Sequence, residues 1–118
     1  MNIEEYREHC IGKPVVTEGF PFDLNTLVFK VMGKVFALTN VEEFKSINLK
    51  CEPKFALELR EEYEGIKPGY HMNKKHWNTC DTKNDIPNKL FKKLIDDSYN
   101  LVASKLKKVL KEELKNLN

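Results

Sequence analysis

The sequence contains no apolar run of the length that a membrane-spanning helix requires. Its first ten residues, MNIEEYREHC, are acidic and include no apolar stretch, so they do not resemble a secretory signal peptide. The five glycines are scattered and form neither a dinucleotide-binding fingerprint nor a phosphate-binding loop. We therefore expect neither a membrane protein nor a nucleotide-binding enzyme of those two kinds.

Cysteine is scarce as well, and Cys10, Cys51 and Cys80 cannot all pair with one another. Their spacings match no zinc or redox motif, so we expect reduced thiols, a cytoplasmic protein and no cofactor. Cys80 follows His76 by four residues, which in a strand separates the two side chains by about 13 Å. That separation argues against a Cys–His nucleophile, and we expect a protein that is not an enzyme.

Charge of one sign dominates only the second half of the chain. The net charge is +2, but residues 67–118 hold twelve lysines and six acidic residues. A basic half is compatible with an anionic partner, although lysine-rich helix faces are often only solvated. The length of 118 residues suits one domain that spans residues 1–118.

The hydrophobic pattern predicts helices and strands in the order αββββαββα. Asn2 and Glu5 form a capping-box pattern before a first helix that ends near Gly12, and Pro53 opens a second helix. Strand-like runs occupy residues 15–17, 27–32, 35–39 and 46–51, with a two-residue loop at 33–34 that suits a type II′ turn. Two more strands, one with Tyr70 and Met72 and one with Trp77 and Thr79, flank a polar turn at 73–75. This order predicts an α+β two-layer sandwich in which an antiparallel sheet carries helices on one face.

The stretch PGYHMNKKHWNT, residues 68–79, gathers two of the three histidines, the only tryptophan, two asparagines and two adjacent lysines. A metal site is one interpretation, since His71, His76 and Cys80 could supply three ligands. The spacing matches no closed zinc pattern, so we expect no metal.

A structural interpretation of the same stretch accounts for part of it. Large aromatic side chains dominate small cores, so we expect Tyr70 and Trp77 to pack. Asn73 or Asn78 would then hold a turn through side-chain-to-backbone hydrogen bonds. The remaining polar groups are left for recognition.

PGYHMNKKHWNT resembles the signature of the MmcQ/YjbR-like proteins, and the resemblance extends to about Leu106. The other matching stretches are TEGFPF (17–22), FKVMGKVFA (29–37), NLKC (48–51), Leu59-Arg60 with Tyr63, and LIDDSYNLV (94–102). The resemblance implies a small cytoplasmic domain with a frataxin-like (CyaY-like) fold, described as a double-wing DNA-binding motif. A frataxin-like fold also raises iron binding, for which the first helix offers only Glu4, Glu5 and Glu8.

The C-terminus departs from this family pattern. Members commonly have a proline just after the residue equivalent to Leu106, whereas this chain has Lys107 there. Because no proline breaks the pattern, we expect one long final helix that continues to about residue 116. Its extra apolar residues must cover either the core or a second copy of the chain, which leaves a homodimer through this helix open.

The leading hypothesis is a non-enzymatic DNA-binding protein with two wings, the hairpin at residues 33–34 and the turn at residues 73–76. The lysines expected to contact phosphates are Lys30, Lys34, Lys50, Lys74 and Lys75. The other recognition groups are His71, Asn73, His76 and Asn78, with the asparagines and His76 directed to sugars or base edges. The alternative is a binding module whose His-Asn-Trp cluster takes a small anionic ligand or a protein partner.

Overall fold

A computed structural model describes residues 1–83 and 85–117, which fold into four helices and one six-stranded sheet. The helices are α1 (Ile3–Ile11), α2 (Pro53–Glu62), α3 (Asn88–Ser104) and α4 (Lys108–Asn116). The strands are β1 (Val16–Gly19), β2 (Thr26–Val31), β3 (Lys34–Asn40), β4 (Ser46–Lys50), β5 (Ile66–Pro68) and β6 (Trp77–Asp81). The predicted helix and strand order is confirmed up to α3.

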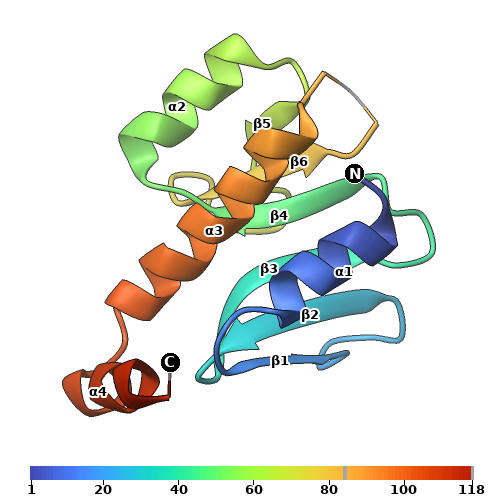
Figure 1. Cartoon of the computed structure of the whole chain (residues 1–118). Coiled ribbons are helices and arrows are strands. Elements are labelled where there is room, and N and C mark those ends of the chain that lie inside the picture. Colours follow the sequence, from blue (N-terminus) through green and yellow to red (C-terminus); the bar gives the residue numbers. More distant parts are fainter. Residues whose placement is uncertain (84, 118) are drawn as a thin grey trace.

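The sheet has the strand order β1-β2-β3-β4-β6-β5, and every neighbouring pair is antiparallel. Figure 1 shows that α1 and α3 lie across the same face of this sheet. The predicted α+β sandwich with an antiparallel sheet and helices on one face is therefore confirmed.

Local signals in the sequence set the helix ends. The Oδ1 atom of Asn2 accepts a hydrogen bond from the Glu5 amide at 2.8 Å and caps α1, as the capping-box pattern predicts. Pro53 occupies the start of α2, where the missing N–H of proline costs no helical hydrogen bond. The Glu52 carboxylate caps the same helix by accepting two backbone N–H groups.

Alternate strand residues point to opposite faces of the sheet. On the helix-covered face, Phe29, Ala37 and Ile47 are fully buried, and Tyr6 of α1 meets the Phe29 ring edge-on at 5.5 Å. We call the opposite face the open face. Its residues are Thr17, Gly19, Thr26, Val28, Lys30, Val35, Leu38, Asn40, Ser46, Asn48, Lys50, Lys67, Trp77, Thr79 and Asp81.

A buried hydroxyl group fixes helix α3 to the sheet. Ser98 Oγ donates to the Phe36 carbonyl at 2.5 Å and accepts from the Lys50 amide at 2.8 Å. These backbone groups belong to β3 and β4, beyond the last pair of their ladder, Ala37 and Leu49. The hydroxyl therefore satisfies two strand groups that the neighbouring strand leaves unpaired.

The β2–β3 turn differs from its predicted position by one residue. The two loop residues are Met32 and Gly33, with φ angles of 48° and 84°, rather than Gly33 and Lys34. Two successive positive φ angles are typical of a type I′ turn, not the predicted type II′ turn. The observed pairing of Val31 with Lys34 keeps Val31 fully buried, and a slip by one residue would turn it to the other face.

The strand expected at Tyr70 and Met72 is also misplaced. Strand β5 ends at Pro68, and residues 69–76 form a loop. The pairing of Ile66 with Cys80 places both side chains in the core, at 2% and 1% exposure. The apolar residue that this strand buries is therefore Ile66, and the chain leaves the sheet after Pro68.

The predicted single helix to residue 116 is wrong, because α3 ends at Ser104 and α4 begins at Lys108. Lys107 has an extended backbone, with ψ at 147°. A straight helix would carry Leu114 about 15 Å beyond Ser104, whereas the break leaves Leu106 and Leu114 only 5% and 8% exposed, within the core cluster. Burial of apolar side chains is the physical reason for the break.

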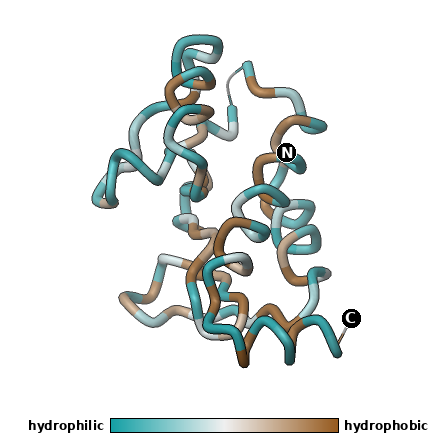
Figure 2. Tube along the Cα trace, turned by 90° about the vertical axis from the view of Figure 1, so that its left-hand side faces the viewer, coloured by the Kyte–Doolittle hydropathy of each residue, from teal (hydrophilic) through white to brown (hydrophobic). Residues whose placement is uncertain are grey.

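Helix α4 still presents apolar residues to solvent. Val109 and Leu117 are 66% and 65% exposed, and Figure 2 shows hydrophobic and hydrophilic positions alternating along this helix near the C label. A homodimer through this helix, which the sequence leaves open, stays a prediction. Within the described residues, no helix combines the length and the apolar character needed to cross a membrane.

Replacement of Ser98 by alanine should lower the free energy of unfolding by about 2 kcal/mol or more, because it leaves a buried N–H and a buried C=O without partners. Urea denaturation followed by circular dichroism measures this loss. The matched control is Ser104→Ala on the same helix, where the serine is exposed and the change should stay below about 0.5 kcal/mol. Equal effects of the two variants would contradict the assigned role of Ser98.

Leu114→Ala should destabilise the protein by about 2 kcal/mol, since this side chain is buried against the core. Leu117→Ala, at the exposed C-cap that follows α4, should cost less than about 0.5 kcal/mol. The same urea titration compares them, and two equally mild variants would show that α4 does not pack as described.

Candidate nucleic-acid interface

Three strand ends bring most of the predicted site residues to one end of the sheet. Strand β3 begins at Lys34, β4 ends at Lys50, and β6 begins at Trp77, opposite Lys50. Because these neighbouring strands are antiparallel, the three positions lie at the same end. Figure 1 shows the β2–β3 turn and the loop before β6 on the same left-hand side. We call residues 32–34, 50 and 69–76 the turn end.

The loop before β6 is organised by Asn73. Its Oδ1 atom accepts hydrogen bonds from the amides of Lys75 and His76 at 2.9 and 3.2 Å, and its carbonyl accepts from the Trp77 amide at 3.0 Å. This geometry confirms the interpretation that Asn73 holds a turn. The side-chain oxygen is therefore already engaged within the loop, which leaves the expected contact to a base edge without support.

Arg60 of α2 ties the same loop to the helical layer. Its Nε donates to the Asn78 Oδ1 atom at 2.7 Å, and its Nη2 donates to the Lys74 carbonyl and, at 3.3 Å, to the Trp77 carbonyl. Asn78 is only 2% exposed and lies on the helix-covered face. The structure therefore separates Asn78 from the accessible surface, which corrects the expectation that it contacts DNA.

Arg60 is the positioning residue that the sequence interpretation missed. The stretch Leu59-Arg60 belongs to the family pattern, but its role depends on a pairing across 18 residues. The available signal was that Asn78 falls between Trp77 and Thr79 in an alternating strand, at a position where a buried polar group needs a partner.

Lys74 and Gly69 close the loop. Lys74 Nζ donates to the Gly69 carbonyl at 3.0 Å, so part of its hydrogen-bonding capacity serves the loop. A Cβ atom at Gly69 would lie 2.8 Å from the Trp77 Cβ, so the backbone here approaches the strand more closely than any side chain would allow. The turn is therefore a close-packed unit rather than a loose tip.

Tyr70 is exposed, which corrects the expectation that it packs. It is 68% exposed, and its ring centroid lies 4.0 Å from that of His71. Its amide donates to Thr79 Oγ1 at 2.9 Å, and this hydroxyl donates to Asn48 Oδ1 at 2.6 Å.

Trp77 is half-buried on the open face rather than placed between the sheet and the helices. The turn end therefore carries the Tyr70 ring and the His71 imidazole, and Trp77 adjoins it at the start of β6.

The lysines of the turn end are available to an anion. Lys34 and Lys75 are exposed and Lys50 is half-buried, and within the described parts of the chain none of the three forms an ion pair. The carboxylate nearest to Lys50 in the sequence is that of Glu52, which caps α2. Hydrogen bonds from the backbone N–H groups of Phe55 and Lys54 lower the pKa of Glu52. Its charge is therefore directed to the helix.

Lys30 is set apart from the other predicted lysines. It lies on the open face of β2, and β3 separates it from β4, so its Cα is about 10 Å from that of Lys50. It lines a pocket with residues of β1 instead.

The three cysteines are buried free thiols. Burial raises the pKa of Cys10 and Cys80 to about 12 and that of Cys51 to about 11. Cys80 faces the core, whereas His71 is exposed in the loop, so these two do not share a site. In residues 1–83 and 85–117, no group of three or more His, Cys, Asp or Glu side chains is arranged to hold a metal ion.

The fold and this site define a small α+β sandwich protein with a basic turn end. The YjbR family model matches residues 11–101. YbdF of Escherichia coli O157:H7 is 43% identical over 106 residues, which cover 89% of this chain and 87% of the relative. YjbR of Escherichia coli strain K12 is 30% identical over 115 residues, with coverages of 93% and 98%. The chain therefore belongs to the YjbR family, as the resemblance predicted.

Two solved structures are similar over most of the chain. The crystal structure of the Deinococcus radiodurans protein DR2400 has a TM-score of 0.90 and 38% identity, and the alignment covers 97% of this chain and 88% of that one. A crystal structure of a Pseudomonas syringae protein has a TM-score of 0.75 and 28% identity, with coverages of 86% and 99%. These likenesses establish the fold.

Arg60→Leu should release the loop at residues 73–77, because it leaves the buried Asn78 oxygen and the Lys74 carbonyl without their donor. We expect a loss of about 1–3 kcal/mol in the free energy of unfolding and faster amide exchange at Lys75 and Trp77. Hydrogen exchange followed by NMR measures the second effect. Lys54→Leu, an exposed lysine of the same helix, is the control and should change neither quantity measurably.

Proposed function

We propose that this protein is a non-enzymatic DNA-binding protein that contacts DNA through the turn end. The observation that carries the proposal is the distribution of charged side chains on the open face, where lysines outnumber carboxylates. The open face holds three lysines and a single carboxylate among its described residues, and that carboxylate, Asp81, lies at the end opposite to the turns. Lys34, Lys74 and Lys75 add further positive charge at the turn end.

The arrangement suits a phosphate backbone. Exposed lysines on two separate turns can neutralise phosphates on both sides of a strand or groove. His71 and His76 belong to the same loop as Lys74 and Lys75 and add hydrogen-bonding groups. The exposed Tyr70 ring, tilted against that of His71, offers a surface on which an unpaired base could stack, which favours single-stranded DNA as a second ligand.

The chemistry of the thiols supports a binding role rather than catalysis. A catalytic cysteine needs an accessible thiolate, whereas burial raises the pKa of all three thiols well above neutral pH. Three free cysteines also suit a reducing compartment, and we propose that the protein acts in the cytoplasm.

The test is a titration with a DNA duplex and with a single strand, followed by the fluorescence of Trp77, the only tryptophan. We expect saturable binding at low salt that weakens steeply as salt rises. Lys34→Ala/Lys75→Ala removes one lysine from each turn and should lower the slope of log affinity against log salt by about 2 units for the duplex.

Lys89→Ala/Lys92→Ala is the control, because it removes the same charge from exposed positions on α3, in the helical layer. It should leave the slope nearly unchanged. An equal loss in both double variants would reduce the binding to general electrostatic attraction and overturn the turn-end assignment. Absence of binding to either DNA at low salt would overturn the proposed function itself.

A further inference from the structure

A second feature of the open face is a pocket between β1 and β2. It has a volume of about 280 Å³ and is lined by Thr17, Glu18, Gly19, Phe20, Pro21, Val28 and Lys30. Six of these residues belong to the stretches TEGFPF and FKVMGKVFA, and the seventh, Val28, pairs with Gly19 across the β1–β2 ladder. The DNA-binding proposal leaves this part of the family pattern without a role.

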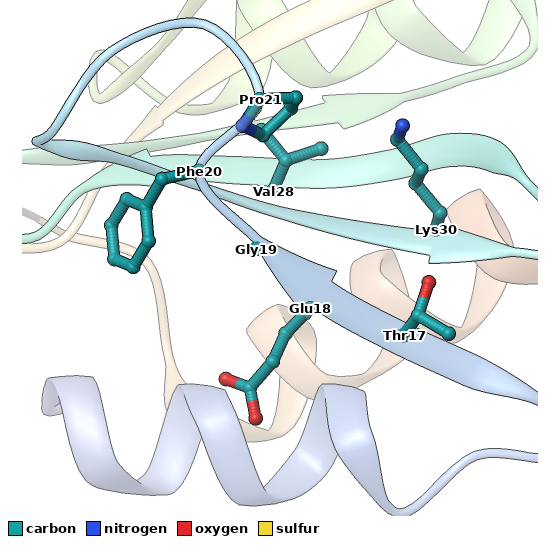
Figure 3. A pocket seen from close by; sticks show the side chains of 7 residues that line it. All are labelled: Thr17, Glu18, Gly19, Phe20, Pro21, Val28 and Lys30. Atoms are coloured by element: carbon teal, nitrogen blue, oxygen red, sulfur yellow. The ribbon is translucent and has the colours of Figure 1, made fainter.

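The pocket has a polar side and an apolar side. Figure 3 shows the ammonium group of Lys30 and the hydroxyl group of Thr17 on one side, and Phe20 and Pro21 on the other. Thr17 and Lys30 are direct cross-strand partners, so their side chains leave the sheet from neighbouring positions on the open face. In the described residues, neither group has an ion pair or side-chain hydrogen bond of its own.

The one carboxylate of the pocket lining is turned out of it. Figure 3 shows Glu18 pointing towards α1, where its carboxylate accepts a hydrogen bond from Arg7 Nε at 2.9 Å. The Lys30 charge therefore remains uncompensated within the pocket. A single half-buried cation beside a hydroxyl favours one anionic group on a ligand.

The apolar side of the pocket is held in place by the loop that follows it. The Asp23 carboxylate accepts hydrogen bonds from the Asn25 and Thr26 amides at 2.8 and 2.7 Å and from the Thr26 hydroxyl at 3.0 Å. Val28 beneath the loop is only 1% exposed although it lies on the open face. Phe20 remains 48% exposed, so its ring is free to contact a ligand.

Gly19 keeps the middle of the pocket empty. A Cβ atom at this position would have no neighbour within 4 Å, so the space above the glycine is open rather than filled by packing. Its φ angle is ordinary, which means that other residues can adopt this backbone. The position therefore allows the pocket to be blocked without strain.

From these observations we infer that the pocket binds a small organic anion, a molecule with one anionic head group on Lys30 and Thr17 and an apolar body against Phe20, Pro21 and Val28. The pocket differs in place and in chemistry from the turn end, so this inference holds or fails independently of DNA binding.

The test uses benzoate as the probe and NMR amide shifts of the full chain as the readout. Benzoate should shift the amides of Thr17, Gly19 and Lys30 in a saturable way, whereas benzyl alcohol and benzylamine, of similar shape but neutral and cationic, should bind at least about tenfold more weakly. Equal shifts with all three probes would overturn the anion specificity, and no localised shifts with benzoate would overturn the site.

Two variants locate the binding. Lys30→Met should weaken benzoate at least about tenfold by removing the cation, and Gly19→Val should abolish binding by filling the space while keeping a strand-favouring residue. Lys67→Met is the control, since Lys67 lies on the open face of β5, at the other edge of the sheet. If Gly19→Val and Lys30→Met retain wild-type spectra elsewhere and still bind benzoate normally, the inference is wrong.

Discussion

The contact on which the rest of the structure depends is the buried hydroxyl of Ser98. It joins α3 to the backbones of β3 and β4 where these strands stop pairing with each other. This contact fixes the long helix on one face of the sheet, and the apolar residues of α1 and α3 then cover that face. Because both helices lie on the same side, the opposite face is left to carry polar and charged groups.

The same constraint orders the turn end. The Lys50 amide bonded to Ser98 belongs to the last residue of β4, whose partner across the ladder is Trp77. Arg60 then holds the loop before Trp77 from the helical side. Groups of the helical layer thus anchor the backbone from one side, while Lys34, Lys75 and Tyr70 remain exposed on the other.

The sequence predicts correctly those structural features whose cause lies in neighbouring residues. The cap at Asn2, the helix start at Pro53 and the strand pattern of β4 concern neighbouring residues, so each is visible in the sequence. The pairing of Arg60 with Asn78 and the burial of Ile66 depend on elements that meet only in the folded state. The prediction of one long final helix was wrong for the same reason. Leu114 keeps helical spacing with α3, so the sequence pattern continues through the break, and only packing against the core separates the two helices.

The break between α3 and α4 also allows α4 to unfold separately from the rest of the domain. Three residues join α3 to α4, and no strand pairing involves α4. Undocking of α4 therefore exposes Leu114 and its neighbours without opening the sheet or moving Ser98. Local unfolding of such an element costs less free energy than unfolding of the whole domain, so α4 gives the domain a sub-global unfolding step of its own.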